Sequence, residues 1–242
     1  MVRLWCRRRG DLIDLVRKLY RLGTVSDALN HLDDFEGLAA TKPFVRPANN
    51  DNAEPDAPAF TLIDEKPLTS KALIAYLDER GIPAGVASSL VREVHYRHGD
   101  KNYFALGLPN ESGGFEIRNP YFKGTIGNKD ISIVPGPTGR VFVFEGMFDF
   151  LTAVARFGGK LDGTALILNS VALKEKAVDW LRQHEPTVIE LYRDNDRSGE
   201  ELAAYFSENL SQPTIVDWST LYQGHNDLNA WHVNQQRGAV RR

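Results

Sequence analysis

The sequence of 242 residues contains a single cysteine, Cys6, and this shortage limits the chemistry that the chain can carry. One thiol cannot form an internal disulfide bond, and it cannot build a multi-cysteine zinc site from this chain alone. Long apolar runs are also missing, because no stretch approaches the roughly 20 apolar residues that span a bilayer. The first residues, MVRLWCRRRGDLIDL, lack the apolar region of a secretory signal. We therefore expect a cytoplasmic protein without a membrane segment.

A large excess of positive charge is absent too. The chain has 29 lysine and arginine residues against 32 aspartate and glutamate residues, and its formal net charge of −3 argues against a general electrostatic hold on nucleic acid. The charges are nevertheless uneven. Basic residues gather near both ends of the chain, whereas acidic residues gather at 145–149 and 194–201. This asymmetry is compatible with phosphate binding at basic faces and metal binding at the acidic centre, and also with ordinary solvated faces and tails.

Periodicity and turn residues divide the chain into segments. Residues 10–32 carry apolar residues at the spacing of amphipathic helices. Residues 41–61 contain four prolines among many polar residues, a composition typical of a flexible linker. Two short helices are expected within 70–90, and aromatic and β-branched residues then alternate with polar ones over 91–134, which predicts antiparallel strands. From residue 141 onward, short apolar strands alternate with helices, as in a parallel sheet covered on both faces.

The resulting prediction is an α/β fold in five segments. These are a helical segment at 1–38, a flexible linker at 39–66, a smaller α+β subdomain at 67–138, a larger α/β domain at 139–235 and a basic tail at 236–242. We expect the functional site in the larger domain, because open parallel sheets bind ligands beyond the carboxyl ends of their strands.

Carboxylates follow two of the apolar strands predicted in the larger domain. Glu145 comes directly after the strand VFVF, and Asp149 follows one helical turn later. Asp194 and Asp196 follow the strand TVIELY after a single arginine, and their spacing places both side chains on one side of an extended segment. We therefore expect about four carboxylates at one edge of the sheet.

Carboxylates packed this closely repel one another unless they are protonated or bind a metal ion. Oxygen ligands in a crevice suit Mg²⁺ or Mn²⁺, which keep some of their waters and bind phosphates. Each motif alone has an ordinary structural explanation, since Glu-Gly after a strand is a common turn and an aspartate before a helix is commonly an N-cap. The two motifs together, each following a strand of one α/β unit, favour a metal site.

The same motifs resemble those of a known catalytic domain. EGMFD at 145–149, DNDRSG at 194–199 and HNDLNAW at 225–231 resemble the motifs of Toprim domains, the fold that bacterial DnaG-type primases share with type IA and type II topoisomerases and some nucleases. The forms Glu-Gly-x-x-Asp and Asp-x-Asp-basic-x-Gly are similar to those of primases, with Arg197 at the basic position. The resemblance implies a Rossmann-like parallel sheet flanked by helices, with Asp227 as a further acidic residue.

Segments outside this domain resemble primases of mobile elements. CRRRGDLIDLVRKLY, which begins at Cys6, resembles the last strand and following helix of the primase zinc ribbon. Only Cys6 remains of the expected ligand set, so we expect no zinc. We interpret residues 1–38 as a helical remnant of a zinc-ribbon region, either truncated or starting inside a longer gene. Residues 69–135 resemble the subdomain that precedes Toprim in such primases.

These resemblances imply a DNA primase that joins ribonucleotides on a single-stranded DNA template, with Mg²⁺ or Mn²⁺ as its cofactor. The implied catalytic residues and metal ligands are Glu145, Asp149, Asp194 and Asp196, with Asp227 as a further ligand. Glu145 is either a ligand or a general acid/base. The implied nucleic-acid or nucleotide contacts are Arg118, Asn119, Lys123, Lys129 and Arg197, several of which alternate with aromatic residues as in grooves for single strands. The implied partners are single-stranded DNA, nucleoside triphosphates and a replicative helicase.

Two other functions remain open at this point. A Toprim nuclease would cut phosphodiesters with the same metal ions, and only the subdomain before the acidic domain favours synthesis over cleavage. A non-catalytic module of a mobile element would bind DNA or dock a partner without a metal ion in the acidic crevice.

Overall fold

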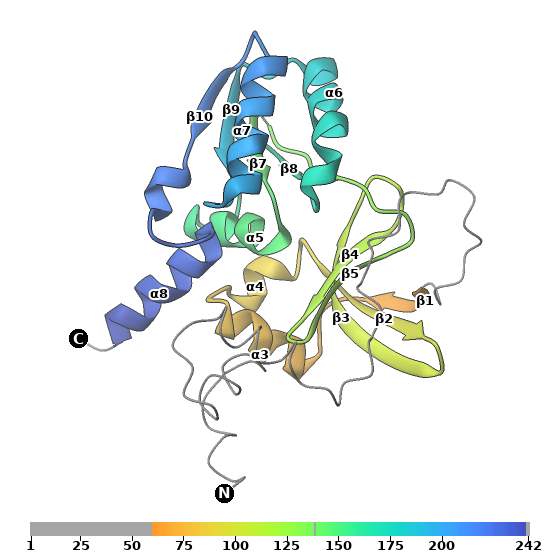
Figure 1. The fold of residues 1–242 in the computed structure, drawn as a ribbon. Coiled ribbons are helices and arrows are strands. Elements are labelled where there is room, and N and C mark those ends of the chain that lie inside the picture. The colour runs from red at the N-terminus through yellow and green to blue at the C-terminus, as the bar shows by residue number, and fades with distance from the viewer. Residues whose placement is uncertain (1–59, 138, 241–242) are drawn as a thin grey trace, which may run out of the picture. The chain divides into compact units, whose positions relative to one another are not determined.

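The computed structural model describes residues 60–137 and 139–240 (Figure 1). The predicted N-terminal helical segment, most of the predicted linker and the last two residues of the predicted basic tail lie outside the described residues. The described residues belong to one unit of the chain, 55–242, and form two five-stranded sheets.

The first sheet is antiparallel and has the order β1-β2-β3-β4-β5. Its strands are β1 (Thr61–Lys66), β2 (Arg92–His98), β3 (Lys101–Pro109), β4 (Phe115–Asn119) and β5 (Phe122–Ile126). Short turns join β2 to β3 and β4 to β5, so strands that are neighbours in sequence pair directly, as the alternating pattern predicts. The helices α3 (Lys71–Glu79) and α4 (Ala84–Ala87) connect β1 to β2.

Strand β1 corrects the end of the predicted linker. The composition places residues 61–66 in the linker, but these residues pair with β2 as an edge strand of the first sheet. Most of β1 is exposed, including Leu62 and Ile63, so it lacks the one-sided burial that gives a strand its alternating pattern. The pairing partner, and not the local sequence, makes this segment a strand.

The second sheet has the order β10-β9-β7-β8-β6. Strands β7 (Arg140–Phe144), β8 (Thr164–Ile167), β9 (Val188–Tyr192) and β10 (Thr214–Asp217) are parallel, and β6 (Ser132–Val134) is an antiparallel edge strand. The parallel strands confirm the predicted α/β domain. Strand β6 lies in the range assigned to the smaller subdomain, so the chain enters the second sheet earlier than the sequence predicts.

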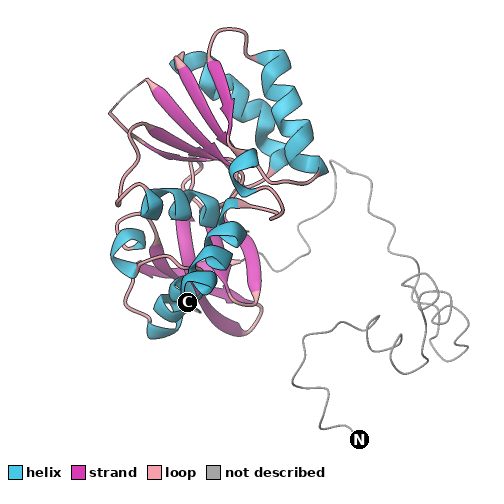
Figure 2. Cartoon of the chain, turned by 90° about the vertical axis from the view of Figure 1, so that its left-hand side faces the viewer, coloured by secondary structure: helices cyan, strands magenta, loops and turns pink. Residues whose placement is uncertain are grey.

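Helices cover both faces of the second sheet (Figures 1 and 2). One face carries α5 (Met147–Arg156) and α8 (Leu228–Val240), the latter after the 3-10 turn η3 (Ser219–Tyr222). The other face carries α6 (Lys174–His184), which continues the 3-10 turn η2 (Val171–Leu173), and α7 (Arg197–Asn209). Alternation along β7 explains both layers, because Phe142 and Phe144 join the apolar cluster of α5, whereas Val141 and Val143 join that of α6 and α7.

The apolar cluster of α5 continues into the smaller subdomain. Leu73 and Leu77 of α3 and Leu106 of β3 belong to the same buried cluster as Phe144 and Leu151. This shared core fixes the antiparallel sheet against α5, the helix that starts at the carboxyl end of β7.

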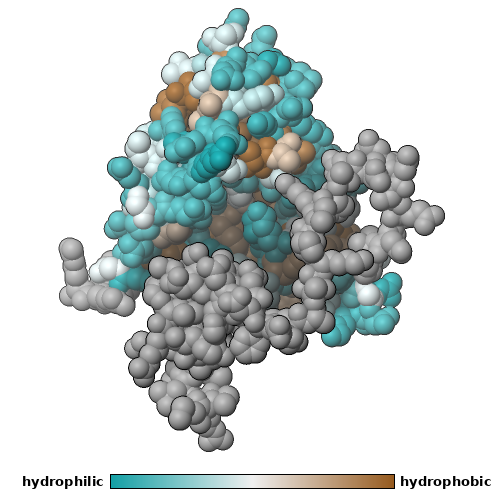
Figure 3. All heavy atoms as spheres, viewed as in Figure 1, coloured by the Kyte–Doolittle hydropathy of each residue, from teal (hydrophilic) through white to brown (hydrophobic). Residues whose placement is uncertain are grey.

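Polar residues cover most of the described surface on the face drawn in Figure 3. Figure 3 shows hydrophilic residues over most of the described surface of one face, with small apolar areas between them. Within 60–137 and 139–240, every helix is too short or too polar to cross a membrane.

Candidate active site

A cavity of about 430 Å³ lies where the segments after β7 and β9 meet the smaller subdomain. Five carboxylates of the second sheet and its connections line this cavity: Glu145, Asp149, Asp194, Asp196 and Asp227. Three cations of the smaller subdomain line it as well: Arg80, Arg118 and Lys123. The cavity therefore joins clustered negative charge from one subdomain to clustered positive charge from the other.

Glu145 is joined to the loop after β9 by a hydrogen bond. The backbone N–H of Asp194 donates to Oε1 of Glu145 at 2.9 Å, which connects the ends of two neighbouring strands. Gly199 permits this close approach. A Cβ at Gly199 would lie 2.1 Å from the carbonyl oxygen of Asp194 and 2.8 Å from Oε1 of Glu145. A larger residue at Gly199 would therefore force these two groups to move.

Asp149 lies in the first turn of α5 and is only 8% exposed. Its Oδ1 accepts a hydrogen bond from the backbone N–H of Asn229 at 3.1 Å. Nδ2 of Asn229 donates in turn to the carbonyl oxygen of Arg80 at 2.9 Å and to the hydroxyl of Thr152 at 2.8 Å. Asn229 thus fixes Asp149 relative to the end of α3, where Arg80 enters the cavity.

The segment 194–196 is oriented by its middle residue. Nδ2 of Asn195 lies 3.1 to 3.2 Å from three backbone carbonyl oxygens of the segment 219–225, so the amide is occupied outside the cavity. Asp194 and Asp196 on either side of it both line the cavity. This arrangement follows the i, i+2 spacing from which the sequence predicts a common side for the two carboxylates.

Two of the five carboxylates also begin helices. Oδ1 of Asp196 accepts a hydrogen bond from the N–H of Gly199 at 2.9 Å and caps α7. Oδ1 of Asp227 accepts a hydrogen bond from the N–H of Ala230 at 2.6 Å at the start of α8. These two side chains therefore each accept a hydrogen bond at the start of a helix and also line the cavity.

Burial and mutual repulsion raise the pKa of three of these carboxyl groups. Burial, followed by the charges of Glu145 and Asp227, raises the pKa of Asp194 to about 7. Burial and the charges of Asp227 and Asp194 raise the pKa of Asp149 well above its ordinary value. Burial also raises the pKa of Glu145, although the hydrogen bond from Asp194 opposes this rise. These shifts indicate that the protein alone does not compensate the negative charge of the cluster.

The cations on the other side of the cavity are partly desolvated. Burial lowers the pKa of Arg118 and of Lys123. The guanidinium carbon of Arg80 lies 4.6 Å from the centre of the Phe148 ring, and Nη1 of Arg80 donates to Oδ1 of Asn229 at 3.1 Å. Partly desolvated cations attract an anionic ligand more strongly than fully hydrated cations do.

The donor atoms of the cavity suit a hard divalent cation. Among the described residues, no three His, Cys, Asp or Glu side chains are already grouped as a metal site. The chemistry of the five acidic side chains nevertheless fits Mg²⁺, because carboxylate oxygens are the ligands it prefers. A divalent cation would also compensate the charge that raises the pKa of Asp149 and Asp194. The residues present therefore fit Mg²⁺ or Mn²⁺.

The structure brings most of the predicted site residues together. All five predicted acidic residues line the cavity with Arg118 and Lys123. Three other predicted contacts do not line it. Asn119, at the end of β4, donates to the carbonyl oxygen of Phe104 at 3.2 Å, Lys129 is exposed, and Arg197 pairs with Glu201 at 2.8 Å. Any contact of these three residues with nucleic acid would lie outside the cavity.

Other cavity residues were missed from the sequence. Arg80 ends a helix that lies far before the acidic motifs in the sequence, and no pattern in the sequence links it to them. Asn229 lies inside the motif HNDLNAW, from which only Asp227 was predicted as a site residue. The loop 169–172 follows β8, a parallel strand, so the rule that sites form at carboxyl ends of strands could have indicated it.

The parallel sheet carries a glutamate after one strand and Asp-x-Asp after its neighbour, the pattern in which the sequence resembles Toprim domains. Residues 142–232 match the family model described as Toprim-like, which confirms this part of the sequence-based prediction. Residues 62–127 match the model of a domain of unknown function, DUF8464. No curated protein matches the chain in sequence at a significant level.

Solved structures are similar in fold over about three quarters of the chain. The primase fragment of the bacteriophage T7 primase-helicase protein is similar with a TM-score of 0.55 at 14% identity, covering 78% of this chain and 80% of the fragment. A second similar chain comes from the structure of bacteriophage T7 lagging-strand DNA polymerase interacting with primase domains bound to an RNA/DNA hybrid and dTTP. Its TM-score is 0.52 at 16% identity, covering 73% of this chain and 90% of that chain. At these identities the likeness establishes a shared fold, and it confirms the predicted fold class.

Proposed function

We propose that this chain is a primase-type nucleotidyltransferase that synthesises short RNA primers on single-stranded DNA in an Mg²⁺-dependent reaction. One observation carries the proposal. Five carboxylates and three cations from two subdomains line a single cavity, and the fold is that of a primase fragment. A nucleoside triphosphate with its divalent cation needs both kinds of group, because the carboxylates hold the cation and the basic residues bind the phosphates.

The acidic residues have distinct parts in this proposal. Asp149, Asp194, Asp196 and Asp227 would hold the divalent cation, which when bound neutralises phosphate charge and favours deprotonation of the attacking 3′-hydroxyl. Oε1 of Glu145 already accepts a hydrogen bond from the N–H of Asp194, whereas Oε2 keeps both of its lone pairs for a proton or the cation. Burial raises the pKa of Glu145 toward neutral pH. A general base works best when its pKa lies near the pH of the reaction.

The basic residues bind and orient the substrates. Arg118 lies on β4 and Lys123 on the paired strand β5, so one hairpin presents both cations to the cavity. Arg80 reaches the same cavity from the end of α3 and is held by Asn229. Three cations fixed by separate elements position phosphates of a triphosphate or a template strand before the reaction.

The proposed reaction also defines the partners. Template DNA and nucleoside triphosphates are the substrates, and a replicative helicase is the expected partner protein. The similarity to a fragment of a bacteriophage primase-helicase protein supports this partner, and it supports a role in replicating a mobile element. We accordingly propose a cytoplasmic location.

Primer synthesis on single-stranded DNA with ribonucleotides and Mg²⁺ tests the proposal. The paired variant Asp194→Asn with Asp196→Asn should lose the product and keep the fold, because asparagine is as good an N-cap as aspartate. Asp179→Asn is the matched control, since Asp179 is exposed on α6, pairs with Arg182 and does not line the cavity. If the paired variant still makes primers at the rate of the control, the carboxylates do not have the proposed role.

A further inference from the structure

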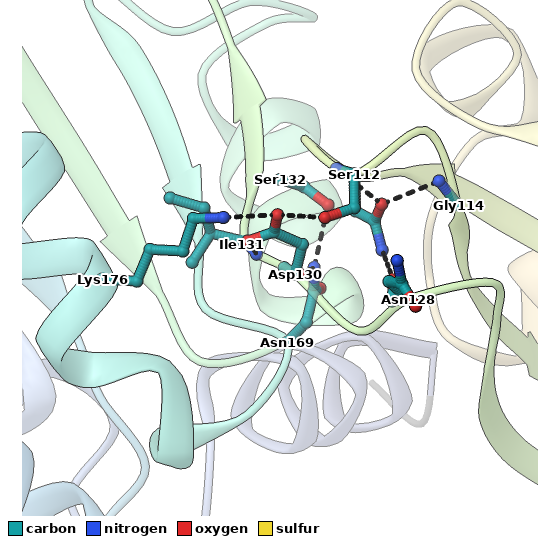
Figure 4. A network of polar contacts seen from close by, with 9 residues as sticks. Ser112, Gly114, Asn128, Asp130, Ile131, Ser132, Asn169 and Lys176 are labelled. Atoms are coloured by element: carbon teal, nitrogen blue, oxygen red, sulfur yellow. Dashed lines mark hydrogen bonds and ion pairs between the residues drawn. The ribbon is translucent and has the colours of Figure 1, made fainter.

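A buried aspartate outside the cavity joins the two subdomains. Asp130 lies in the connection between β5 and β6, and only 2% of its surface is exposed. Its Oδ2 accepts hydrogen bonds from the hydroxyl of Ser112 and from Nζ of Lys176, both at 2.5 Å, and its Oδ1 accepts one from the N–H of Ile131 at 2.7 Å (Figure 4). Ser112 belongs to the turn between β3 and β4, whereas Lys176 belongs to α6. One carboxylate is therefore held from both sides.

The turn held by Ser112 forms the base of the hairpin that carries two of the cavity cations. Oδ1 of Asn110 accepts from the N–H of Gly114 at 2.9 Å, and Nδ2 of Asn110 donates to the carbonyl oxygen of Asn128 at 2.9 Å. The residues just before β4 and just after β5 are thereby fixed to one another. The N–H of Glu111 also donates to the carbonyl oxygen of Ile131 at 2.9 Å. The orientation of the β4–β5 hairpin follows from these contacts.

On the side of the second sheet, Asn169 connects the same segment to the cavity. Its Nδ2 donates to the carbonyl oxygen of Asp130 and to the hydroxyl of Ser132, both at 2.8 Å (Figure 4). The side chain is buried, and the backbone has a φ of 62°, a conformation that asparagine and glycine adopt more easily than other residues. Asn169 and the next three residues line the cavity.

The charges of the cluster argue for a geometric role. Burial alone would raise the pKa of Asp130, but the hydrogen bonds from Lys176, Ser112 and the N–H of Ile131 outweigh it and lower this pKa, so the ionised carboxylate is stabilised where it lies. Because Ser112 and Lys176 come from different subdomains, both hydrogen bonds form only when the two subdomains keep their relative position.

We propose that Asp130, Lys176, Ser112 and Asn169 form a positioning cluster for the candidate active site. The cluster sets the distance between the cations of the β4–β5 hairpin and the carboxylates after β7 and β9. It also holds the loop 169–172 that completes the cavity wall. The effect on substrates rests on the proposed function, whereas the effect on geometry does not.

A distance measurement tests the geometry without any enzymatic assay. Spin labels are placed at Tyr121→Cys in the hairpin turn and Ala204→Cys on α7, both at exposed positions, with Cys6→Ser removing the native thiol. Wild-type residues at the cluster should give one narrow distance distribution by electron–electron double resonance. Lys176→Met should broaden it, and Lys176→Arg, which keeps the charge and the donor, should restore it.

Matched variants separate this cluster from the rest of α6. Lys174→Met removes a lysine of the same helix that lies over Tyr205 and takes no part in the cluster, and it should leave the distribution unchanged. Ser112→Ala removes the donor from the opposite subdomain and gives a second test by a change of one hydroxyl. Unchanged distributions in both Lys176→Met and Ser112→Ala would overturn the proposal.

Substrate affinity links the geometry to the site. We expect Lys176→Met to weaken binding of GTP with Mg²⁺ about tenfold by calorimetry, because misplaced cations lose their contacts with phosphate. Lys176→Arg should restore the affinity. Broadened distances with unchanged GTP affinity would refute the link to the site. A wild-type chain that binds no GTP while its distances respond as expected would refute the proposed function and leave the geometric role standing.

Discussion

Replacing Asp194 by asparagine should stabilise the metal-free protein while it removes a group from the candidate active site. Asp194 is half-buried, and burial together with neighbouring carboxylates raises its pKa from 3.8 to about 7. No side-chain hydrogen bond to its carboxylate is found in the described part of the chain, so the substitution removes no such bond. The charge at this position is therefore a cost to the metal-free fold.

The sign and size of this cost follow from the pKa. A folded-state pKa above the unfolded value means that the folded protein holds the proton more tightly, so this contribution to stability is full below pH 3.8 and is lost as the pH rises through about 7. A rise of this size corresponds to about 4 kcal/mol for a fully buried group, and solvent screening at a half-buried site reduces this to about 2 kcal/mol. Asparagine stays neutral and should recover that amount at pH 8.

Urea unfolding in EDTA checks this value for the wild type, Asp194→Asn and the control Asp179→Asn. The gain in unfolding free energy of Asp194→Asn should be present at pH 8 and should shrink toward pH 5, where the wild-type carboxyl group is protonated. Added Mg²⁺ should stabilise the wild type more than the variant, because only the wild type has the full set of ligands. A variant that is less stable than the wild type at pH 8, or a gain that does not change with pH, would refute the reasoning.

Three further predictions concern one buried carboxylate of the first sheet and two residues that hold the site. Burial alone would raise the pKa of Glu93, but hydrogen bonds from Thr69, His95, Ser70 and Lys66 outweigh it and lower the pKa from 4.5 to about 2. Ionised Glu93 therefore contributes about 3 kcal/mol to the unfolding free energy, and this contribution is lost as the pH falls from 4.5 to about 2. Glu93→Gln should flatten this part of the dependence of stability on pH, measured by urea unfolding. An equally steep dependence in the variant would contradict the assignment. Gly199→Ala should lower the unfolding free energy by about 2 kcal/mol, because the new Cβ meets the backbone of Asp194, whereas Gly85→Ala, which meets nothing within 4 Å, should be neutral or slightly stabilising. Asn229→Ala should cost about 2 kcal/mol in the same measurement, since it removes hydrogen-bond partners from Arg80 and Thr152, and an unchanged unfolding free energy would count against that network.

The acidic edge of the site could be predicted because it depends on local sequence and on one rule of sheet geometry. Glu145 and Asp194 each follow an apolar strand, and parallel neighbours deliver their carboxyl ends to one edge. The i, i+2 spacing then places Asp194 and Asp196 on one side of the segment, because the amide of Asn195 is hydrogen-bonded outside the cavity.

The basic side of the cavity could be predicted only in part. Arg118 and Lys123 lie near aromatic residues in the sequence, a pattern that indicates nucleic-acid binding. Arg80, by contrast, reaches the cavity through the packing of α3 against α5 and the contact with Asn229. Such a position depends on the docking of two subdomains, which no periodicity encodes. The same holds for β1, since an exposed edge strand becomes a strand only through its partner.

The measurement that tests the central claim most directly follows template and product in one reaction. A single-stranded DNA template labelled at its 5′ end is incubated with the full chain, Mg²⁺ and ribonucleoside triphosphates carrying a second label. The account predicts short, alkali-labile labelled products with the template unchanged in length, and no such product from the paired Asp194→Asn and Asp196→Asn variant. Shortened template without labelled RNA, lost in the paired variant, would contradict the account and identify the acidic edge as the site of a nuclease.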